Sequence, residues 1–138
     1  RLVSRGLGDV YKRQILKNMK NKMNVHLYEK SYHKSHFLKE VSEKLNLNTK
    51  VFQKNIFEIK NLETGTIMSR AFKPMPVVLE LVYENFSKYK NLIFFMGKSG
   101  KKIFENSKKN WELEYIEKKS LTSEDSFLIN IKKIKKKN

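Results

Sequence analysis

Strand-like and helix-like segments alternate along most of this chain, and this alternation constrains its fold more than any other feature. Apolar residues at every second position predict strands, and apolar residues three and four apart predict helices. The predicted strands are 23–29, 49–56, 66–70, 91–96, 111–117 and 126–134, and the predicted helices are 31–46, 73–86 and 100–110. Helices placed between successive strands are typical of an open α/β sheet, so we expect an α/β fold.

Residues at the element boundaries support this prediction. Ser31 suits the N-cap of the first helix, Asn46 suits its end, and Pro76 suits the first turn of the second helix. The expected apolar stripe of the first helix is Phe37, Leu38, Val41 and Leu45. The apolar run after Asn91 predicts a strand that is buried on both faces. Only residues 118–125 separate the last two strands, so we expect them to pair as an antiparallel hairpin at a sheet edge.

The chain is strongly basic, with a formal net charge of +16 over 138 residues. Such a charge favours a polyanionic partner, most often a nucleic acid. The alternative is that A/T-rich codons raise the lysine content without selecting any binding face. The densest basic cluster, "INIKKIKKKN" at the C-terminus, is interpreted as a solvated end. The chain has no cysteine and no apolar run long enough to span a membrane, so we expect a cytoplasmic protein with no membrane partner.

Two charged residues stand where parallel strands are predicted to end. In α/β sheets ligands bind outside the carboxyl ends of the strands, and Glu29 and Arg70 both lie there. The Glu29 carboxylate can accept hydrogen bonds from both hydroxyls of a ribose, or it can simply favour the N-terminus of the following helix. Arg70 can bind a carboxylate or phosphate with two hydrogen bonds, or it can form a surface ion pair.

Other motifs argue against nucleophilic or metal chemistry. His33 and His36 are three residues apart on a predicted helix, but no third ligand is evident, so solvent-facing histidines are the better interpretation. The "FMGKSGKK" stretch around Gly97 lacks the spacing of a phosphate-binding loop.

Near the N-terminus, Gly6 and Gly8 precede Glu29 by about twenty residues, which is close to the spacing in dinucleotide-binding folds.

Several linked segments between Val25 and Ile134 together resemble the bacterial 16S ribosomal RNA guanine-N7 methyltransferases, the glucose-inhibited division B family. The segments that carry this resemblance are "HLYEKSYHKSHFLKEVSEKLNL", "VFQKNIFEI", "MSRAFKPMPVVLEL" and "LIFFMGK". The Ser-Arg-Ala block, with the Phe-Leu helix upstream, is the most specific part. The family usually has Lys-Gly after the late strand, whereas this chain has Met96, Gly97 and Lys98, so Lys98 receives no role.

The resemblance implies a Rossmann-like fold and methyl transfer from S-adenosyl-L-methionine to a guanine of 16S ribosomal RNA in the small ribosomal subunit. By resemblance, Glu29 takes the place of the acid that binds the cofactor ribose. Ile56 and Phe57 take the place of the adenine-contacting pair, and Arg70 that of the cofactor-site arginine. Guanine N7 carries a lone pair and no proton, so the reaction needs positioning rather than a general base.

The resemblance also implies that the N-terminal part of the family's domain is missing. Residues 1–14 read as a non-native scar of the kind left by sequencing adapters, and residues 15–138 as the C-terminal part of one methyltransferase domain. Without residues 1–14 the net charge is +13. We therefore expect a partial Rossmann-like sheet that lacks its first, central strand, which would lie between the strands near Val25 and Thr66. The spacing of Gly6 and Gly8 from Glu29 is then a coincidence.

Two alternatives to the truncated enzyme stay open. The first is a non-catalytic basic RNA-binding module, which would fold without a cofactor and bind RNA in a salt-dependent way. The second is a methyltransferase of the same fold that acts on another substrate, because a fold does not determine a function. For the truncated enzyme we expect weak cofactor binding and little turnover.

Overall fold

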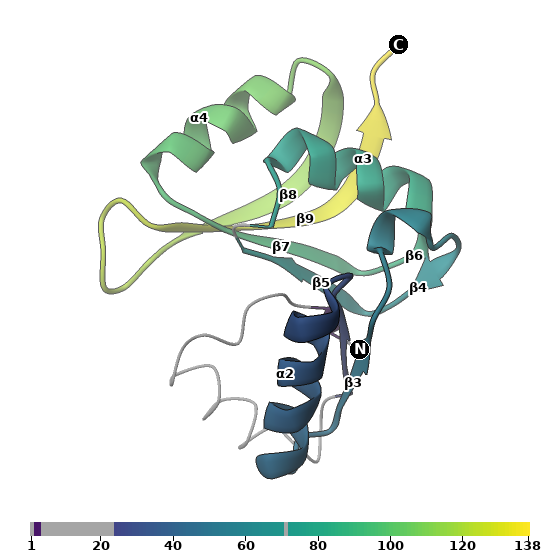
Figure 1. Ribbon diagram of the computed structural model, residues 1–138. Coiled ribbons are helices and arrows are strands. Elements are labelled where there is room, and N and C mark those ends of the chain that lie inside the picture. The colour runs from purple at the N-terminus through teal and green to yellow at the C-terminus, as the bar shows by residue number, and fades with distance from the viewer. Residues whose placement is uncertain (1, 4–23, 71) are drawn as a thin grey trace.

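The computed structural model describes residues 2–3, 24–70 and 72–138. The predictions for Gly6 and Gly8, and for most of the segment 1–14, lie outside these residues, as does Ala71 of the Ser-Arg-Ala block. The described chain forms a seven-stranded sheet with helices on both faces (Figure 1). The predicted α/β class is therefore confirmed.

The main sheet has the strand order β3-β2-β1-β5-β7-β9-β8. The first five strands of this order run parallel to one another, while β9 is antiparallel to β7 and β8 is antiparallel to β9. The strands are β1 (Leu2–Val3), β2 (Val25–Tyr28), β3 (Thr49–Phe52), β5 (Thr66–Ser69), β7 (Asn91–Met96), β8 (Trp111–Lys119) and β9 (Phe127–Lys136). The C-terminal antiparallel hairpin at the sheet edge is as predicted.

Among the described residues, the two residues of β1 occupy the position expected for the missing central strand. Leu2 and Val3 pair with Val25 and His26 of β2 on one side and with Thr66 and Ile67 of β5 on the other. The partial sheet is confirmed, but the expected gap is thus filled over two residues. Backbone hydrogen bonding explains this pairing, because N–H and C=O groups of β2 and β5 that are buried without a partner are costly.

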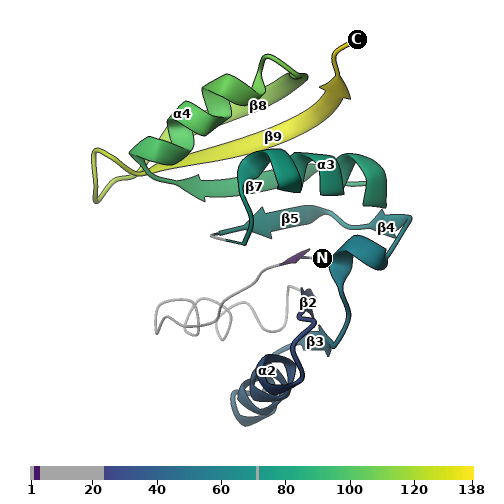
Figure 2. The same ribbon diagram turned by 45° about the horizontal axis from the view of Figure 1, so that its top comes forward.

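Among the described residues, three helices cover the sheet, namely α2 (Tyr32–Lys44), α3 (Met75–Asn85) and α4 (Lys98–Ser107). In Figure 2, α3 and α4 lie together beside β7, β8 and β9, and α2 lies at the other end of the sheet beside β2 and β3. Strand β2 shows why both faces need cover. Its Val25 and Leu27 pack with Leu38 of α2, whereas Tyr28 on its other face packs against the larger core under α3.

The cap of α2 follows the sequence prediction, and its apolar stripe does so except at Phe37. Ser31 is the N-cap, and its hydroxyl accepts a hydrogen bond from the Lys34 N–H at 3.5 Å. Asn46 follows the helix with a positive φ of 49°. Phe37, however, is 55% exposed, while Ser35 and Ser42 are buried beside Leu38. The prediction that Phe37 is a core residue is therefore wrong for the described chain.

The main core lies between the sheet and the helices α3 and α4. Leu79 and Val82 of α3, Phe104 of α4, and Ile129 and Ile131 of β9 are all fully buried there. Alternation along β9 produces this arrangement, because every second side chain faces the helices.

The opposite face of β7 differs from the prediction. Leu92 and Phe94 are buried against the helices, but Phe95 is 42% exposed and Ile93 is only half-buried. The expectation that β7 is buried on both faces is therefore wrong for the described residues. No described helix covers this part of the opposite face.

The remaining elements connect the sheet to its helices. A 3-10 turn, η1 (Ile56–Glu58), follows β3. The short strands β4 (Leu62–Glu63) and β6 (Phe86–Lys88) pair in a separate parallel sheet. The basic C-terminus is not a loose end, because β9 pairs with β8 as far as Lys136, opposite Trp111.

Candidate functional site

The carboxyl ends of the parallel strands bring the predicted site residues to one edge of the sheet. Glu29 follows β2, Ile56 and Phe57 follow β3 through η1, and Arg70 follows β5. Because β2, β3 and β5 run in the same direction, their ends meet at the same edge. Helix α4 begins at that edge as well, because Gly97 directly follows β7.

Glu29 is held in place by backbone contacts. Its N–H donates to the Phe52 carbonyl at 3.0 Å, which extends the pairing of β2 with β3. Its carboxylate accepts a hydrogen bond from the Ser31 N–H at 3.0 Å, and the side chain is only 4% exposed. This contact beside the start of α2 is the one that the helix-capping interpretation predicts.

The turn η1 presents one buried and one exposed apolar side chain. Asn55 caps the turn by accepting a hydrogen bond from the Phe57 N–H at 3.2 Å. Ile56 is buried, whereas Phe57 is 36% exposed. The Phe57 ring lies 6.0 Å from the ring of Phe72, a residue that the sequence reasoning did not consider.

A small apolar cavity adjoins this turn. It has a volume of about 50 Å³ and lies between the ends of β2 and β5, the turn η1 and helix α3. Tyr28, Ile56, Ser69 and Phe72 are among its lining residues. Elements far apart in the sequence thus form an apolar wall next to the end of β2.

Asn85, in the last turn of α3, holds η1 against the core. It is buried, and its side-chain amide donates to the carbonyls of Ile56 at 3.3 Å, Phe57 at 2.9 Å and Ile59 at 2.7 Å. Its side-chain carbonyl accepts a hydrogen bond from Lys60 Nζ at 3.2 Å. The sequence reasoning missed Asn85, and its only signal was a polar residue at the end of an apolar helix.

No hydrogen bond or ion pair joins Arg70 to Glu29, Ile56 or Phe57. Its side chain is exposed, and it makes no hydrogen bond or ion pair with any other described residue. The preceding Ser69 is buried and lines the apolar cavity instead. The surface ion pair that was the alternative interpretation of Arg70 is absent within the described residues.

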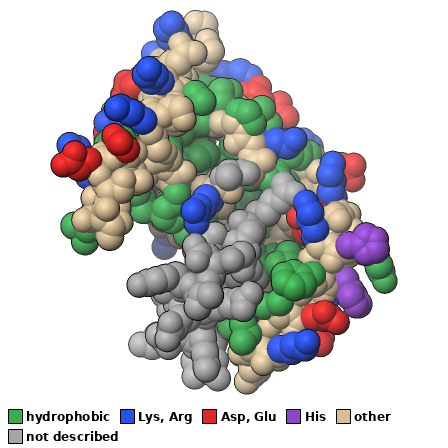
Figure 3. All heavy atoms as spheres, turned by 60° about the vertical axis from the view of Figure 1, so that its left-hand side comes forward, with side chains coloured by type: hydrophobic (Ala, Val, Ile, Leu, Met, Phe, Trp, Pro, Cys, Tyr) green, Lys and Arg blue, Asp and Glu red, His purple; other side chains and the backbone are tan. Residues whose placement is uncertain are grey.

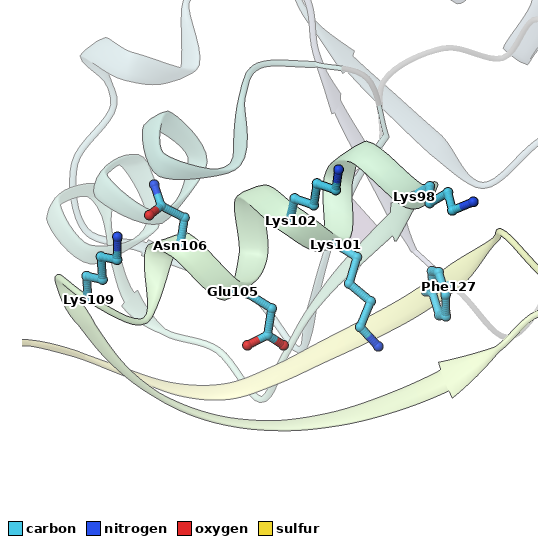
Figure 4. A pocket seen from close by; sticks show the side chains of 7 residues that line it. All are labelled: Lys98, Lys101, Lys102, Glu105, Asn106, Lys109 and Phe127. Atoms are coloured by element: carbon cyan, nitrogen blue, oxygen red, sulfur yellow. The ribbon is translucent and has the colours of Figure 1, made fainter.

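Two wider grooves flank this edge. The first, of about 590 Å³, lies beside η1 and is lined by Lys30, Gln53, Lys54, Asn55, Glu58, Ile59 and Lys60. The second, of about 560 Å³, runs along the outer face of α4 and is lined by Lys98, Lys101, Lys102, Glu105, Asn106, Lys109 and Phe127 (Figure 4). Elsewhere, basic and acidic side chains are interspersed over the face seen in Figure 3.

Neither the histidines nor the helices of the described residues indicate a metal site or a membrane-spanning segment. His33 and His36 are both exposed on α2, and the ring of His36 stacks on Tyr32 at 5.9 Å. Within residues 2–3, 24–70 and 72–138, no three potential metal ligands lie close enough to hold an ion. Over the same residues, no helix has the length and apolar character needed to cross a membrane.

A known protein family matches most of the chain. Residues 14–129 match the family described as GidB, rRNA small subunit methyltransferase G. A curated relative, the ribosomal RNA small subunit methyltransferase G of Pelagibacter ubique (strain HTCC1062), is 63% identical over 124 residues. That alignment covers 90% of this chain but only 58% of the relative.

Solved structures show the same fold at low sequence identity. A SAM-dependent methyltransferase from Aquifex aeolicus superposes with a TM-score of 0.65 at 13% identity, covering 94% of this chain and 80% of that one. TrmK of M. capricolum, in complex with S-adenosyl-homocysteine, gives a TM-score of 0.61 at 16% identity and covers 95% and 61% of the two chains. The described chain therefore has the Rossmann-like methyltransferase fold, partial relative to these proteins.

Proposed function

Because this chain belongs to the GidB family of rRNA small subunit methyltransferases G, we propose that the protein transfers a methyl group to a guanine N7 of 16S ribosomal RNA. The observation that carries this proposal is the 63% identity over 124 residues to a protein named ribosomal RNA small subunit methyltransferase G. Guanine N7 as the acceptor atom follows from the family resemblance. The chain spans 58% of that relative's length.

We propose that Glu29, Ile56, Phe57 and Arg70 bind S-adenosyl-L-methionine. Their chemistry fits the adenosine half of that molecule. A carboxylate at a strand end can accept the ribose hydroxyls, and the apolar side chains beside it offer a surface for a flat ring. Glu29 already accepts the Ser31 N–H, so a ribose hydroxyl would have to share the carboxylate with that contact.

The size of the cavity argues for weak cofactor binding by this chain. Ligand sites commonly enclose roughly 300–1,000 Å³ and are mostly apolar. The apolar cavity beside Ile56 holds only about 50 Å³, and the groove of about 590 Å³ beside η1 is lined mainly by polar and charged side chains. A cofactor would have to contact exposed Phe57 and Arg70 or displace the side chains that line the cavity. We therefore expect an affinity weaker than micromolar.

The proposed reaction asks the protein mainly to position its substrates. When bound, S-adenosyl-L-methionine supplies an electrophilic methyl group. A guanine N7 has a lone pair and no proton, so the residues of the site need to align two reactants rather than remove a proton. We propose 16S rRNA, within the small ribosomal subunit, as the partner and the cytoplasm as the compartment.

Cofactor binding is tested by ultraviolet crosslinking of tritiated S-adenosyl-L-methionine, which detects weak complexes. We expect the chain to be labelled, with competition by S-adenosyl-homocysteine but not by ATP. Arg70→Gln should reduce labelling severalfold, whereas Lys73→Gln, which removes an exposed positive charge three residues away, should not. Labelling no stronger than that of serum albumin, or equal loss in both variants, would overturn the proposed site.

The acceptor is tested with small ribosomal subunits that lack the modification. Tritium recovered as N7-methylguanosine from 16S rRNA supports the proposal, and tritium in any other nucleoside points to a different substrate. If this chain transfers no methyl group and crosslinks no cofactor, but binds RNA in a salt-sensitive way, the alternative of a non-catalytic RNA-binding module is favoured.

A further inference from the structure

Helix α4 carries an outward-facing row of lysines whose role the cofactor site does not explain. Five lysines fall between residues 98 and 109, with Glu105 as the only acid in that stretch. The four that line the groove are Lys98, Lys101, Lys102 and Lys109. Figure 4 shows Lys98 and Lys109 toward opposite ends of the helical segment, so positive charge extends along its whole length.

The packing of α4 forces these lysines outward. Phe104 is fully buried and Ser107 is nearly so, and the Ser107 hydroxyl donates to the Ile103 carbonyl at 2.8 Å. Gly100 lets the first turn approach β7, since a Cβ there would lie 2.6 Å from the Cβ of Met96. The inner face is therefore fixed, and the lysines occupy the outer face by helical periodicity.

Some of these lysines are neutralised by acids and others are not. Lys101 pairs with Glu117, and Lys108 pairs with Glu105 at 3.0 Å. Lys98 lies 3.9 Å from Asp125, but both side chains are largely exposed, so this pair is weak. Lys102 and Lys109 have no acidic partner among the described residues.

The spacing and the shape of the groove fit an extended polyanion. Lys98 and Lys102 are one helical step of four residues apart, a rise of about 6 Å along the axis, and Lys109 extends the row past the end of α4. The groove is open rather than enclosed, and Phe127 forms part of it with Lys101 Nζ 4.6 Å from its ring centre. An open, cationic surface with one aromatic ring matches single-stranded nucleic acid better than a compact ligand.

The position of the groove connects it to the proposed chemistry. Helix α4 begins at Gly97, directly after β7, and β7 runs parallel to β5, so α4 begins at the sheet edge where Arg70 follows β5. A strand of RNA lying along α4 would therefore lead toward that edge. This step rests on the proposed function, since it takes RNA to be the substrate.

We propose that the outer face of α4 binds the phosphate backbone of single-stranded RNA through Lys98, Lys102 and Lys109. Its role is to hold the substrate strand while the target base reaches the carboxyl edge of the sheet. Contacts to phosphates give affinity and register without reading the base sequence.

The test compares two triple variants of equal charge by fluorescence anisotropy, with a labelled 20-nucleotide single-stranded RNA of mixed sequence. The groove variant is Lys98→Gln, Lys102→Gln and Lys109→Gln. The matched control is Lys39→Gln, Lys44→Gln and Lys50→Gln, which are exposed on α2 and β3 and form no ion pair within the described residues. Each triple lowers the formal net charge of +16 by three.

Three lost phosphate contacts should reduce the slope of log K against log salt by about 2 and weaken binding by about 100-fold near 0.1 M salt. The control triple should weaken binding less than about fivefold, and replacing the three groove lysines with arginine should preserve it. Thermal unfolding followed by circular dichroism should show both glutamine triples folded, because every changed position is exposed.

Equal losses in the two triples would overturn the proposal, because they would show diffuse attraction to the whole basic surface. Binding of the wild type to phosphatidylserine vesicles as tightly as to RNA, lost only in the groove triple, would assign the face to a membrane surface instead. The assay contains no cofactor, so it is independent of the proposed activity. If the groove triple loses RNA binding while the wild type fails to crosslink cofactor, the assignment of α4 as an RNA-binding face stands, and both its role in methyl transfer and the proposed function fall.

Discussion

Replacing Asn85 with aspartate tests whether one buried amide holds the turn at the candidate site. The two side chains have nearly the same shape, so Asn85→Asp removes two hydrogen-bond donors without creating a cavity. In the native chain the Asn85 amide nitrogen donates hydrogen bonds to the carbonyls of Ile56, Phe57 and Ile59 at 3.3, 2.9 and 2.7 Å. Lys60 can keep its contact with the remaining oxygen.

The expected loss of stability follows from the number of hydrogens involved. An amide has two, so at least two of the three carbonyls lose their donor, and each buried group left unsatisfied costs about 1–3 kcal/mol. The sum is about 4 kcal/mol. An unfolding entropy of about 2.1 cal/mol/K per residue gives about 0.3 kcal/mol/K for a chain of this size, so Tm should fall by about 13 °C.

Urea and thermal unfolding, followed by circular dichroism, measure this loss. Asn106→Asp is the matched control, because Asn106 is exposed on α4 and takes the same change in charge. It should shift stability by less than about 0.5 kcal/mol. Hydrogen exchange should also show faster exchange of the Ile59 N–H, which donates to the Ile56 carbonyl at 3.3 Å within η1. A loss below about 1 kcal/mol for Asn85→Asp, or an equal loss for the control, would refute this account.

Two further predictions concern α4 and its neighbours. Gly100→Ala should lower the free energy of unfolding in urea by about 1–2 kcal/mol, because the new Cβ would lie 2.6 Å from the Cβ of Met96. Gly97→Ala is the control, because its Cβ would lie 3.8 Å from the nearest atom and make no close contact. Equal losses in the two variants would contradict this prediction. The hydrogen bond to the Tyr115 hydroxyl raises the pKa of Lys108, so its stabilisation is complete below the ordinary value of 10.5 and is lost as pH rises through the raised pKa. Stability should therefore fall less steeply above about pH 10.5 in Tyr115→Phe, and parallel curves for the two proteins would contradict the prediction.

Short-range patterns in the sequence determined which segments form which elements. Ser31 caps α2 because its hydroxyl needs only an N–H three residues away, and the alternation along β9 sorts Ile129 and Ile131 to one face whatever the neighbouring strands are. The carboxyl-edge positions of Glu29 and Arg70 follow from the same local patterns together with the rule for parallel strands. The family resemblance rests on these same segments.

Only the tertiary structure decided which apolar faces are covered and which distant groups meet. Periodicity marks Phe37 and Phe95 as core candidates, but burial depends on the elements packed opposite, and both side chains are exposed. Asn85 contacts η1 across 26–29 residues of sequence, and the partners of a buried amide cannot be read from its neighbours in the chain. The pairing of Leu2 and Val3 between β2 and β5 has the same origin, since two flanking strands, rather than local propensity, supply its hydrogen bonds.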